Sequence, residues 1–542
     1  MKKYIIAIAS ISFTTVTLFS SCNKLAENPL GTLTPDQFYK TQSDAIAAVT
    51  SVYSTLSTDV NNDFPIYGRN LNLIVDNPSD NQVYSPSNTN PDVRALGTAT
   101  YVSTNDRVKK IYAQLYWGIN KANLAVDNIS LLPDSIFFDK TRSKANLINE
   151  AKFIRALYYF NLVRLYGDVP LVLHEQANVN TAAANLVSRT PKDSVYLQII
   201  ADLNAATALP IYSANNLGRV TGGAAHALLG KVYVTRQDWA NAKTELEKVI
   251  TAGSGFASAT GNYGYDLFAN FSDAFQPGTK NGKEHIFSAQ FNGTAGGFTS
   301  TNTLSSFVWS PTSYTADIPA DASVIEGLFN IADQRRSTTF YDSLYNKSTG
   351  AWVKWPYYNF LKFVDQSAGF TNGLAGTQGA NSKVNFPVIR YADVLLLYAE
   401  VLNELNGGPN PDAYNAINIV RGRAYNANTY ISNGAYAAYN YKSNGAYTSH
   451  ANDLSGLNQA DFRDSVFTER RREFIQESQR WFDLVRRTDR GPGQYYLQSV
   501  KAMPGNPKAA ATLKDTLFPI PQTEIDLYGG RNPNFKQNPG WN

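Results

Sequence analysis

The sequence predicts a mainly α-helical protein, with about four helix pairs around one core and a large irregular region that contains a few short strands. Apolar residues recur at helical spacing in adjacent segments, and this periodicity is lost between about residues 254 and 387. The runs LGKVY at 229–233 and AKTEL at 242–246 match part of the tetratricopeptide pattern of paired helices. Such pairs stack side by side, so we expect a tetratricopeptide-like scaffold.

The helices are predicted from their apolar faces and from the residues that flank them. Thr34 followed by Pro35 is typical of a helix start, and Gly167 with Pro170 is typical of a helix end. The predicted helices cover residues 34–56, 108–132, 144–166, 191–209, 221–233, 239–250, 390–406 and 411–424.

A further helix is predicted over residues 462–487, the stretch with the densest charge pattern in the chain. Phe467, Phe474, Trp481 and Val485 share one helical face, which we expect in the core. Opposite charges recur three or four residues apart on the other face, where they can pair along a helix surface. We therefore interpret this stretch as structural, and we expect Trp481 and Trp239 to be buried.

The irregular parts of the sequence are rich in residues that suit loops. Residues 59–106 are polar and contain a turn at 76–80, and residues 254–387 contain a strand-like run at 284–291. Loops of this length are usually functional. Residues 425–457 repeat the run SNGAY, which predicts an exposed insertion that is an idle loop, a partner contact or a ligand contact.

The N-terminus has the pattern of a bacterial lipoprotein signal. Lys2 and Lys3 precede an apolar stretch that ends in Ser20-Ser21-Cys22. We expect residues 1–21 to be removed, Cys22 to be acylated and residues 22–33 to form a tether, although a plain signal peptide with a chance cysteine is the alternative. Cys22 is the only cysteine, so the chain cannot form an internal disulfide.

Signals for catalysis or for a metal site are weak. The four histidines lack metal-ligand spacing, and His226 lies in an apolar helix, where a core or hydrogen-bonded role is expected. Residues 278–284 lack the spacing and the hydroxyl residue of a phosphate-binding loop. The net charge of +4 is too small to indicate a nucleic-acid partner. We expect no catalytic residue, no metal and no cofactor.

Several segments together resemble the SusD/RagB family of outer-membrane lipoproteins of Bacteroidetes. They are Ser21-Cys22 and the runs at 150–171 (EAKFIRALYYFNLVRLYGDVPL), 390–400 (RYADVLLLYAE), 469–487 (ERRREFIQESQRWFDLVRR) and 517–541 (LFPIPQTEIDLYGGRNPNFKQNPGW). The resemblance implies an N-terminal region at 34–253, an irregular region at 254–387 and a C-terminal region at 388–542. It also implies a surface-exposed outer-membrane protein that covers a SusC-like TonB-dependent barrel and captures glycans or other nutrients without cleaving them.

The resemblance places a ligand site in two stretches of the chain, without a residue-by-residue match. A sugar site needs aromatic rings and polar groups that bind hydroxyls. The predicted contacts are Asp80, Arg94, Tyr101 and Asn105 before the helix at 108, and Trp309 and Tyr314 in the irregular region, with Tyr84, Trp352 and Trp355 as weaker candidates. A peptide-binding protein of the same family, a surface glycoside hydrolase and a pure protein scaffold remain as alternatives.

Overall fold

The structure is a computed structural model, and it describes most of the chain from Phe38 to Trp541. The described residues are 38–58, 64–83, 88–176, 188–211, 217–293, 302–304, 318–319, 322–346, 351–365, 382–425 and 452–541. Cys22, Trp309, Tyr314 and most of the predicted insertion therefore lie outside the described residues.

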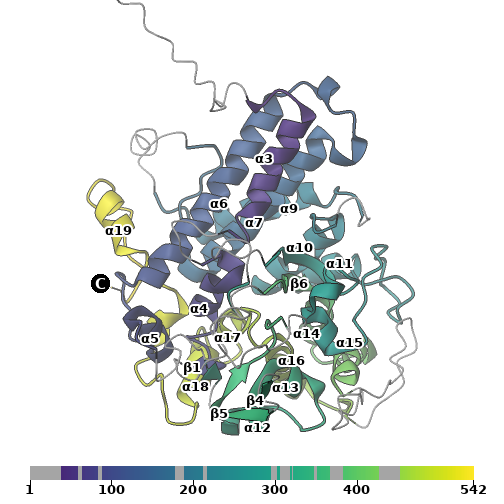
Figure 1. The fold of residues 1–542 in the computed structure, drawn as a ribbon, viewed down its shortest axis with the longest axis vertical. Helices are drawn as coiled ribbons and strands as arrows, with labels where there is room; N and C mark the ends of the chain where they lie inside the picture. Colours follow the sequence, from purple (N-terminus) through teal and green to yellow (C-terminus); the bar gives the residue numbers. More distant parts are fainter. Residues whose placement is uncertain are drawn as a thin grey trace, which may run out of the picture.

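The N-terminal part of the fold is a group of long helices (Figure 1). They are α3 (Gln42–Ser54), α6 (Asp106–Leu131), α7 (Lys144–Tyr166) and α9 (Lys192–Ala206), and α7 packs against both α6 and α9. The predicted helix start at Thr34 and Pro35 lies outside the described residues. Thr41 caps α3 by accepting a hydrogen bond from the N–H of Asp44. The stretch predicted as a loop also holds short helical turns, η1 (Ile66–Asn70), α4 (Leu71–Val75) and α5 (Pro91–Thr98).

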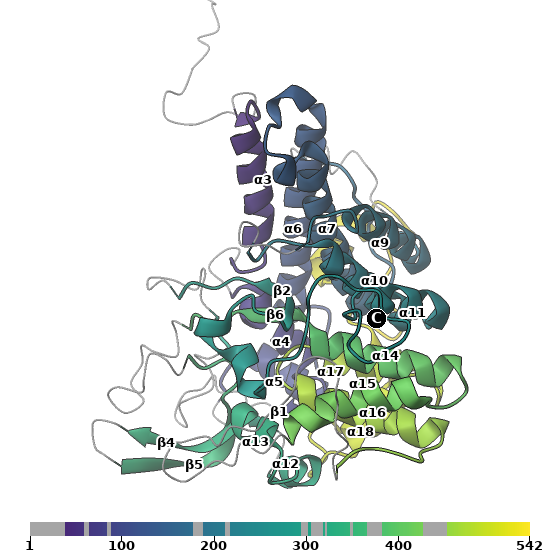
Figure 2. The ribbon, with the colours of Figure 1, turned by 90° about the vertical axis from the view of Figure 1, so that its right-hand side faces the viewer.

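Two helix pairs continue the scaffold (Figure 2). They are α10 (Gly222–Thr235) with α11 (Trp239–Glu247), and α14 (Tyr391–Leu405) with α15 (Pro411–Ala424), and α11 packs against α14. A Cβ atom at Gly230 would lie 2.6 Å from the side chain of Leu246, so only glycine allows this close helix contact. His226 hydrogen-bonds to Glu245 at 2.6 Å, which confirms its expected structural role.

The described strands form three antiparallel pairs. They are β1 (Gln82–Val83) with β3 (Ile318–Pro319), β2 (His285–Ala289) with β6 (Phe386–Arg390), and β4 (Phe340–Asn346) with β5 (Ala351–Phe360). The strand-like run at 284–291 is thus confirmed as β2. Short helices α12 (Ala322–Leu328) and α13 (Gln334–Thr339) lie next to the β4–β5 hairpin (Figure 2).

The C-terminal part contains α16 (Gln459–Phe474), α17 (Arg480–Arg486), α18 (Gln494–Lys501), α19 (Gln522–Glu524) and η11 (Ile525–Gly529). The prediction of one continuous helix over 462–487 is wrong, because the chain leaves the helix at 475–479. Gln476 and Ser478 have φ angles of 68° and 55°, which no right-handed helix contains. Ile475 packs into a small second core with residues of the β4–β5 hairpin, whereas Trp481 is fully buried in the main core.

Two of the expected pairs along the helix form, Arg472 with Glu469 and Arg486 with Asp483, but the charged face is largely buried instead of exposed. Arg335, Arg390 and Arg423 interleave with Glu284, Glu469, Glu473 and Glu477, and we call these seven residues the buried ion cluster. The Nη1 atom of Arg390 lies 2.6 Å from Glu284 and 2.9 Å from Glu473. The cluster therefore joins the irregular region to α15 and α16. In the described part of the chain, no helix is long and apolar enough to cross a membrane.

Candidate functional site

The β1–β3 pair brings together the two stretches in which the sequence predicts a ligand site. Gln82 pairs with Pro319 and Val83 with Ile318. Tyr84 follows β1 directly, and Trp309 and Tyr314 precede β3, but all three lie outside the described residues. Of Trp352 and Trp355 the structure describes only the backbone, which belongs to β5 next to β3. We call the region formed by residues 76–105 and β3 the β1–β3 junction.

Asp80 is an anchor of this junction rather than an exposed ligand contact. Its carboxylate accepts two hydrogen bonds from Arg480, at 2.8 and 2.9 Å, and lies 3.2 Å from Arg471. Burial alone would raise the pKa of Asp80, but the two guanidinium groups hold it well below its usual range. The side chain is 5% exposed, so a ligand cannot reach it in this structure.

Tyr101 is also a structural residue, which corrects its assignment as a ligand contact. Its ring is 1% exposed and lies between Phe518 and Trp541, with centroid distances of 5.1 and 5.0 Å. Aromatic rings at this spacing contribute to the core through both packing and ring electrostatics. No face of the ring is open for a sugar to stack on.

Asn105 has a local structural role as well. Its Oδ1 atom accepts hydrogen bonds from the backbone N–H groups of Arg107 and Val108, at 3.0 and 3.2 Å. These bonds satisfy the free donors at the start of α6. Its Nδ2 atom donates to the carbonyl of Asp92 at 3.1 Å, so both ends of the amide are occupied. The assignment of this buried residue as a ligand contact is therefore corrected too.

Arg94 differs from these three residues, because its side chain is exposed on α5. This helix begins at Asn90, whose Oδ1 atom accepts from the N–H groups of Asp92 and Val93. Val93 and Leu96 bury the opposite face of the short helix. Among the described residues that the sequence singles out, Arg94 is the one whose side chain is open to a ligand at the junction.

The turn at 76–80 is confirmed, but it packs deep in the molecule. Asp76 accepts hydrogen bonds from Asn72 Nδ2 at 2.5 Å and from the N–H of Ser478 at 3.2 Å. Burial raises the pKa of Asp76 to about 7. Lys508, buried as well, donates to the carbonyl of Gln82 at 2.8 Å. The junction thus rests on the C-terminal part of the chain.

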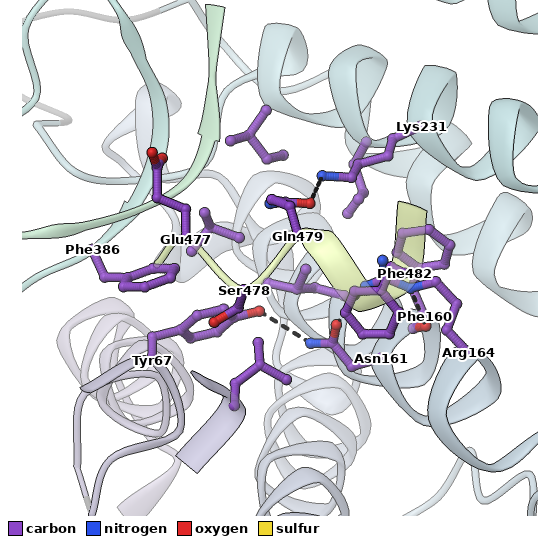
Figure 3. Close-up of a pocket in the computed structure, with 15 residues that line it drawn as sticks. Tyr67, Phe160, Asn161, Arg164, Lys231, Phe386, Glu477, Ser478, Gln479 and Phe482 are labelled. Atoms are coloured by element: carbon purple, nitrogen blue, oxygen red, sulfur yellow. Dashed lines mark hydrogen bonds between the residues drawn. The ribbon is translucent and has the colours of Figure 1, made fainter. Parts of the chain in front are cut away.

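Residues 475–479, which separate α16 from α17, contact the junction through Ser478. They also line a small cavity that lies away from the junction (Figure 3). This cavity has a volume of 30 Å³, which suits a water molecule and is too small for a sugar. Lys231 donates to Gln479 there at 2.6 Å. Arg164 lies between the rings of Phe160 and Phe482, at 3.8 and 3.6 Å, and burial lowers its pKa to about 10. The cavity belongs to the scaffold.

The described junction is built for rigidity rather than for proton transfer. Glycoside hydrolysis requires two accessible carboxyl groups on either side of the bond that breaks. Here Asp80 is ion-paired and Asp76 is fully buried. Within the described ranges, we also find no cluster of three or more His, Cys, Asp or Glu side chains that could hold a metal ion.

Comparison with known families explains this architecture. Residues 33–234 match a family described as "Starch-binding associating with outer membrane", and residues 283–541 match the SusD family. The chain belongs to the SusD/RagB family. Its fold is that of SusD-like proteins, as the sequence predicted, and the two matched ranges include the runs at 150–171 and 469–487.

Individual SusD-like proteins are similar over nearly the full length. "SusD-like protein P2" of Formosa agariphila is 28% identical, with full coverage of both chains. The crystal structure of a SusD homolog from Bacteroides thetaiotaomicron superimposes with a TM-score of 0.74 and 24% identity, and covers 94% of this chain and 99% of its own. A structure described as a laminarin binding SusD-like protein has a TM-score of 0.68 and 24% identity, and covers 93% of this chain and 100% of its own.

Proposed function

We propose that this protein captures oligosaccharides at the cell surface and delivers them to a SusC-like TonB-dependent transporter, without cleaving them. Membership of the SusD/RagB family supports this role, and one structural relative is described as binding laminarin. Two of the three carboxyl groups of the described junction, those of Asp76 and Asp80, are buried or ion-paired, and only Asp92 is partly exposed, which favours binding over hydrolysis.

We place the oligosaccharide site on the outer surface of the β1–β3 junction. The observation that carries this placement is the β1–β3 pairing, because it attaches the segment with Trp309 and Tyr314 to the rigid base around Asp80. Arg94 is exposed on the same base. Aromatic rings can stack on sugar faces while a guanidinium group donates to hydroxyls. Tyr101, Asn105 and Asp80 would hold this surface in place from below.

Binding measurements on the full chain test this site. A glycan array that includes laminarin identifies the glycan that binds most strongly, and calorimetry then gives its affinity. We expect Trp309→Ala and Tyr314→Ala each to weaken binding about tenfold, in the range of an interface anchor. Tyr101→Phe is the matched control, since that ring is buried, and its affinity should equal the wild type. Equal affinities for all variants would contradict the site.

The alternatives give different results in the same experiment. Release of reducing ends from a bound polysaccharide would identify a hydrolase. Binding of peptides but no glycan would identify a peptide-binding member of the family.

For the membrane anchor, Cys22→Ser should move the protein from the membrane fraction to the soluble fraction, and retention in the membrane would contradict acylation. The Trp309→Ala variant should still co-purify with the transporter, because Trp309 is proposed to contact the ligand and not the transporter.

A further inference from the structure

A second opening lies along α6, away from the β1–β3 junction. It has a volume of 720 Å³, within the range of small-molecule sites. Its walls are α6, the segment 170–176 that follows α7, and the C-terminal elements α19 and η11, which lie at the edge of the molecule in Figure 1. We call it the α6 cleft. The side chains that matter here are those of Tyr116, Trp117, Asn120, Gln176, Glu524 and Tyr528.

The walls of the α6 cleft are held by specific hydrogen bonds. The hydroxyl of Tyr116 donates to the carbonyl of Pro170 at 2.8 Å, and Asn123 Nδ2 donates to the carbonyl of Val172 at 3.0 Å. The N–H of Gln176 donates to Asn120 Oδ1 at 3.0 Å. These bonds fix segment 170–176 against α6. This wall of the cleft is therefore preformed, which lowers the entropy cost of binding a ligand.

The lining combines aromatic rings with a carboxylate that has no protein partner. Glu524 is partly buried, and across the residues that the structure describes no side-chain or backbone donor lies within hydrogen-bonding distance of its carboxylate. Burial raises its pKa, and the nearby charge of Lys109 opposes this shift. The indole N–H of Trp117, also partly buried, donates to no acceptor in the described part of the chain. Both polar groups are thus available to a ligand.

The chemistry of the α6 cleft favours a neutral ligand with hydroxyl groups. An apolar ligand would leave the Glu524 carboxylate buried without a partner, which costs free energy. The nearby charge of the exposed Lys109 partly offsets that of the carboxylate, so a ligand needs no positive charge of its own. A pyranose satisfies the carboxylate, since its C–H face packs on an aromatic ring while its hydroxyls donate to a carboxylate or an amide oxygen.

We propose that the α6 cleft is a second saccharide-binding site of this protein, in which Trp117 supplies the stacking surface and Glu524 accepts hydroxyl hydrogen bonds. This inference rests on the proposed carbohydrate-binding function. Trp117 lies twelve residues beyond Asn105, the N-cap residue of the same helix, which is about 18 Å along the helix axis from the base of the β1–β3 junction. Two sites on one protein bind a long chain more tightly than either site alone, because the second contact is intramolecular.

The test uses substitutions in the full chain that disable one site at a time. The probe is the glycan that binds the wild type most strongly on the array, supplied both as a short oligosaccharide and as the polymer. In the Trp309→Ala/Tyr314→Ala background we expect weaker binding to remain, and adding Trp117→Ala or Glu524→Gln should reduce this remaining affinity at least fivefold. In the wild type, Glu524→Gln should reduce polymer affinity more than oligosaccharide affinity.

Controls separate the possible failures. Asp526→Asn changes a neighbouring exposed carboxylate outside the cleft and should leave all affinities unchanged. Glu524→Gln keeps the shape of the side chain, so it reports on binding even if Trp117→Ala fails to fold. If the junction variants abolish all binding, or if the cleft variants leave the remaining affinity unchanged, the second site is refuted while the proposed function stands. If the wild type binds no glycan, both proposals are refuted.

Discussion

The buried ion cluster contains fully buried carboxylates, and the α6 cleft contains a partly buried one, but the partners of these carboxylates differ. Glu473 accepts from Arg335, Arg390 and Arg423, and these guanidinium groups lower its pKa to about 2 although burial opposes them. Glu524 lacks such a partner among the described residues, and burial raises its pKa. A carboxylate with three arginines holds elements of the fold together, whereas a carboxylate without a partner is free to bind a ligand. Charge density alone therefore does not identify a functional site.

The largest effect is expected from breaking the buried ion cluster. Arg390→Met should cost about 3–5 kcal/mol of unfolding free energy, because Glu284, Glu473 and Glu477 would remain buried without a shared partner. Urea denaturation of the purified protein measures this loss. Arg94→Met, on an exposed arginine, is the control and should change stability by less than about 0.5 kcal/mol. Similar stability of the two variants would show that the ion cluster does not stabilise the fold.

A comparable but purely apolar loss is expected at Trp481. The side chain is fully buried and contacts Phe482 and Phe518, with centroid distances of 5.5 and 5.3 Å. Trp481→Ala should cost about 3–5 kcal/mol through the lost burial and the cavity that remains. Thermal unfolding followed by circular dichroism checks the result. A variant as stable as the wild type would show that the signature stretch does not clamp the scaffold.

A smaller effect, with a defined dependence on pH, is expected at Asp76. Its pKa of about 7 in the folded protein lies above the value near 4 of an unfolded chain, so the folded state binds more protons between these two values. Stability should therefore fall as the pH rises from about 4 to 7. Asp76→Asn should remove this part of the slope, and melting temperatures at pH 4.5, 5.5 and 7 measure it. Parallel curves for both proteins would contradict the assignment.

The smallest effect on stability is expected in the α6 cleft. Glu524→Gln removes a buried charge that has no described partner, so the free energy of unfolding should stay within about 0.5 kcal/mol of the wild type or rise slightly. The same denaturation experiment as for Arg390→Met checks this. A loss above about 1 kcal/mol would show that Glu524 has a structural partner after all. The carboxylates of the α6 cleft and of the buried ion cluster would then both stabilise the fold.

Local patterns in the sequence predicted most helices well. Apolar spacing and end signals gave the bounds of α7 and α15 without error, and the tetratricopeptide pattern located α10 and α11. The short helices α4 and α5 were missed because they lie in a polar, Asn- and Pro-rich stretch. The break at 475–479 was also missed, since Ile475 continues the apolar spacing but packs into the second core.

The surroundings of the candidate site residues were harder to predict, because the burial of polar residues depends on contacts between segments that are far apart in the chain. Asp80 and Arg480 are 400 residues apart, and no local pattern indicates that they pair. The same holds for Tyr101, whose partners Phe518 and Trp541 lie near the C-terminus. The α6 cleft was missed for the same reason, as Trp117 and Glu524 come from distant segments. Their one local signal was an aromatic residue on the polar side of a helix.

The support of residues 76–82 by the C-terminal part has a consequence for how this protein folds. Asp76 and Asp80 meet their partners Ser478 and Arg480 across about 400 residues, which is a loop closure of very long range. Such contacts form late and slow the folding reaction, because the chain entropy is lost before the contacts stabilise the fold. An N-terminal fragment would bury two carboxylates without their partners. The chain must therefore be synthesised almost to its end before residues 76–82 can become stable.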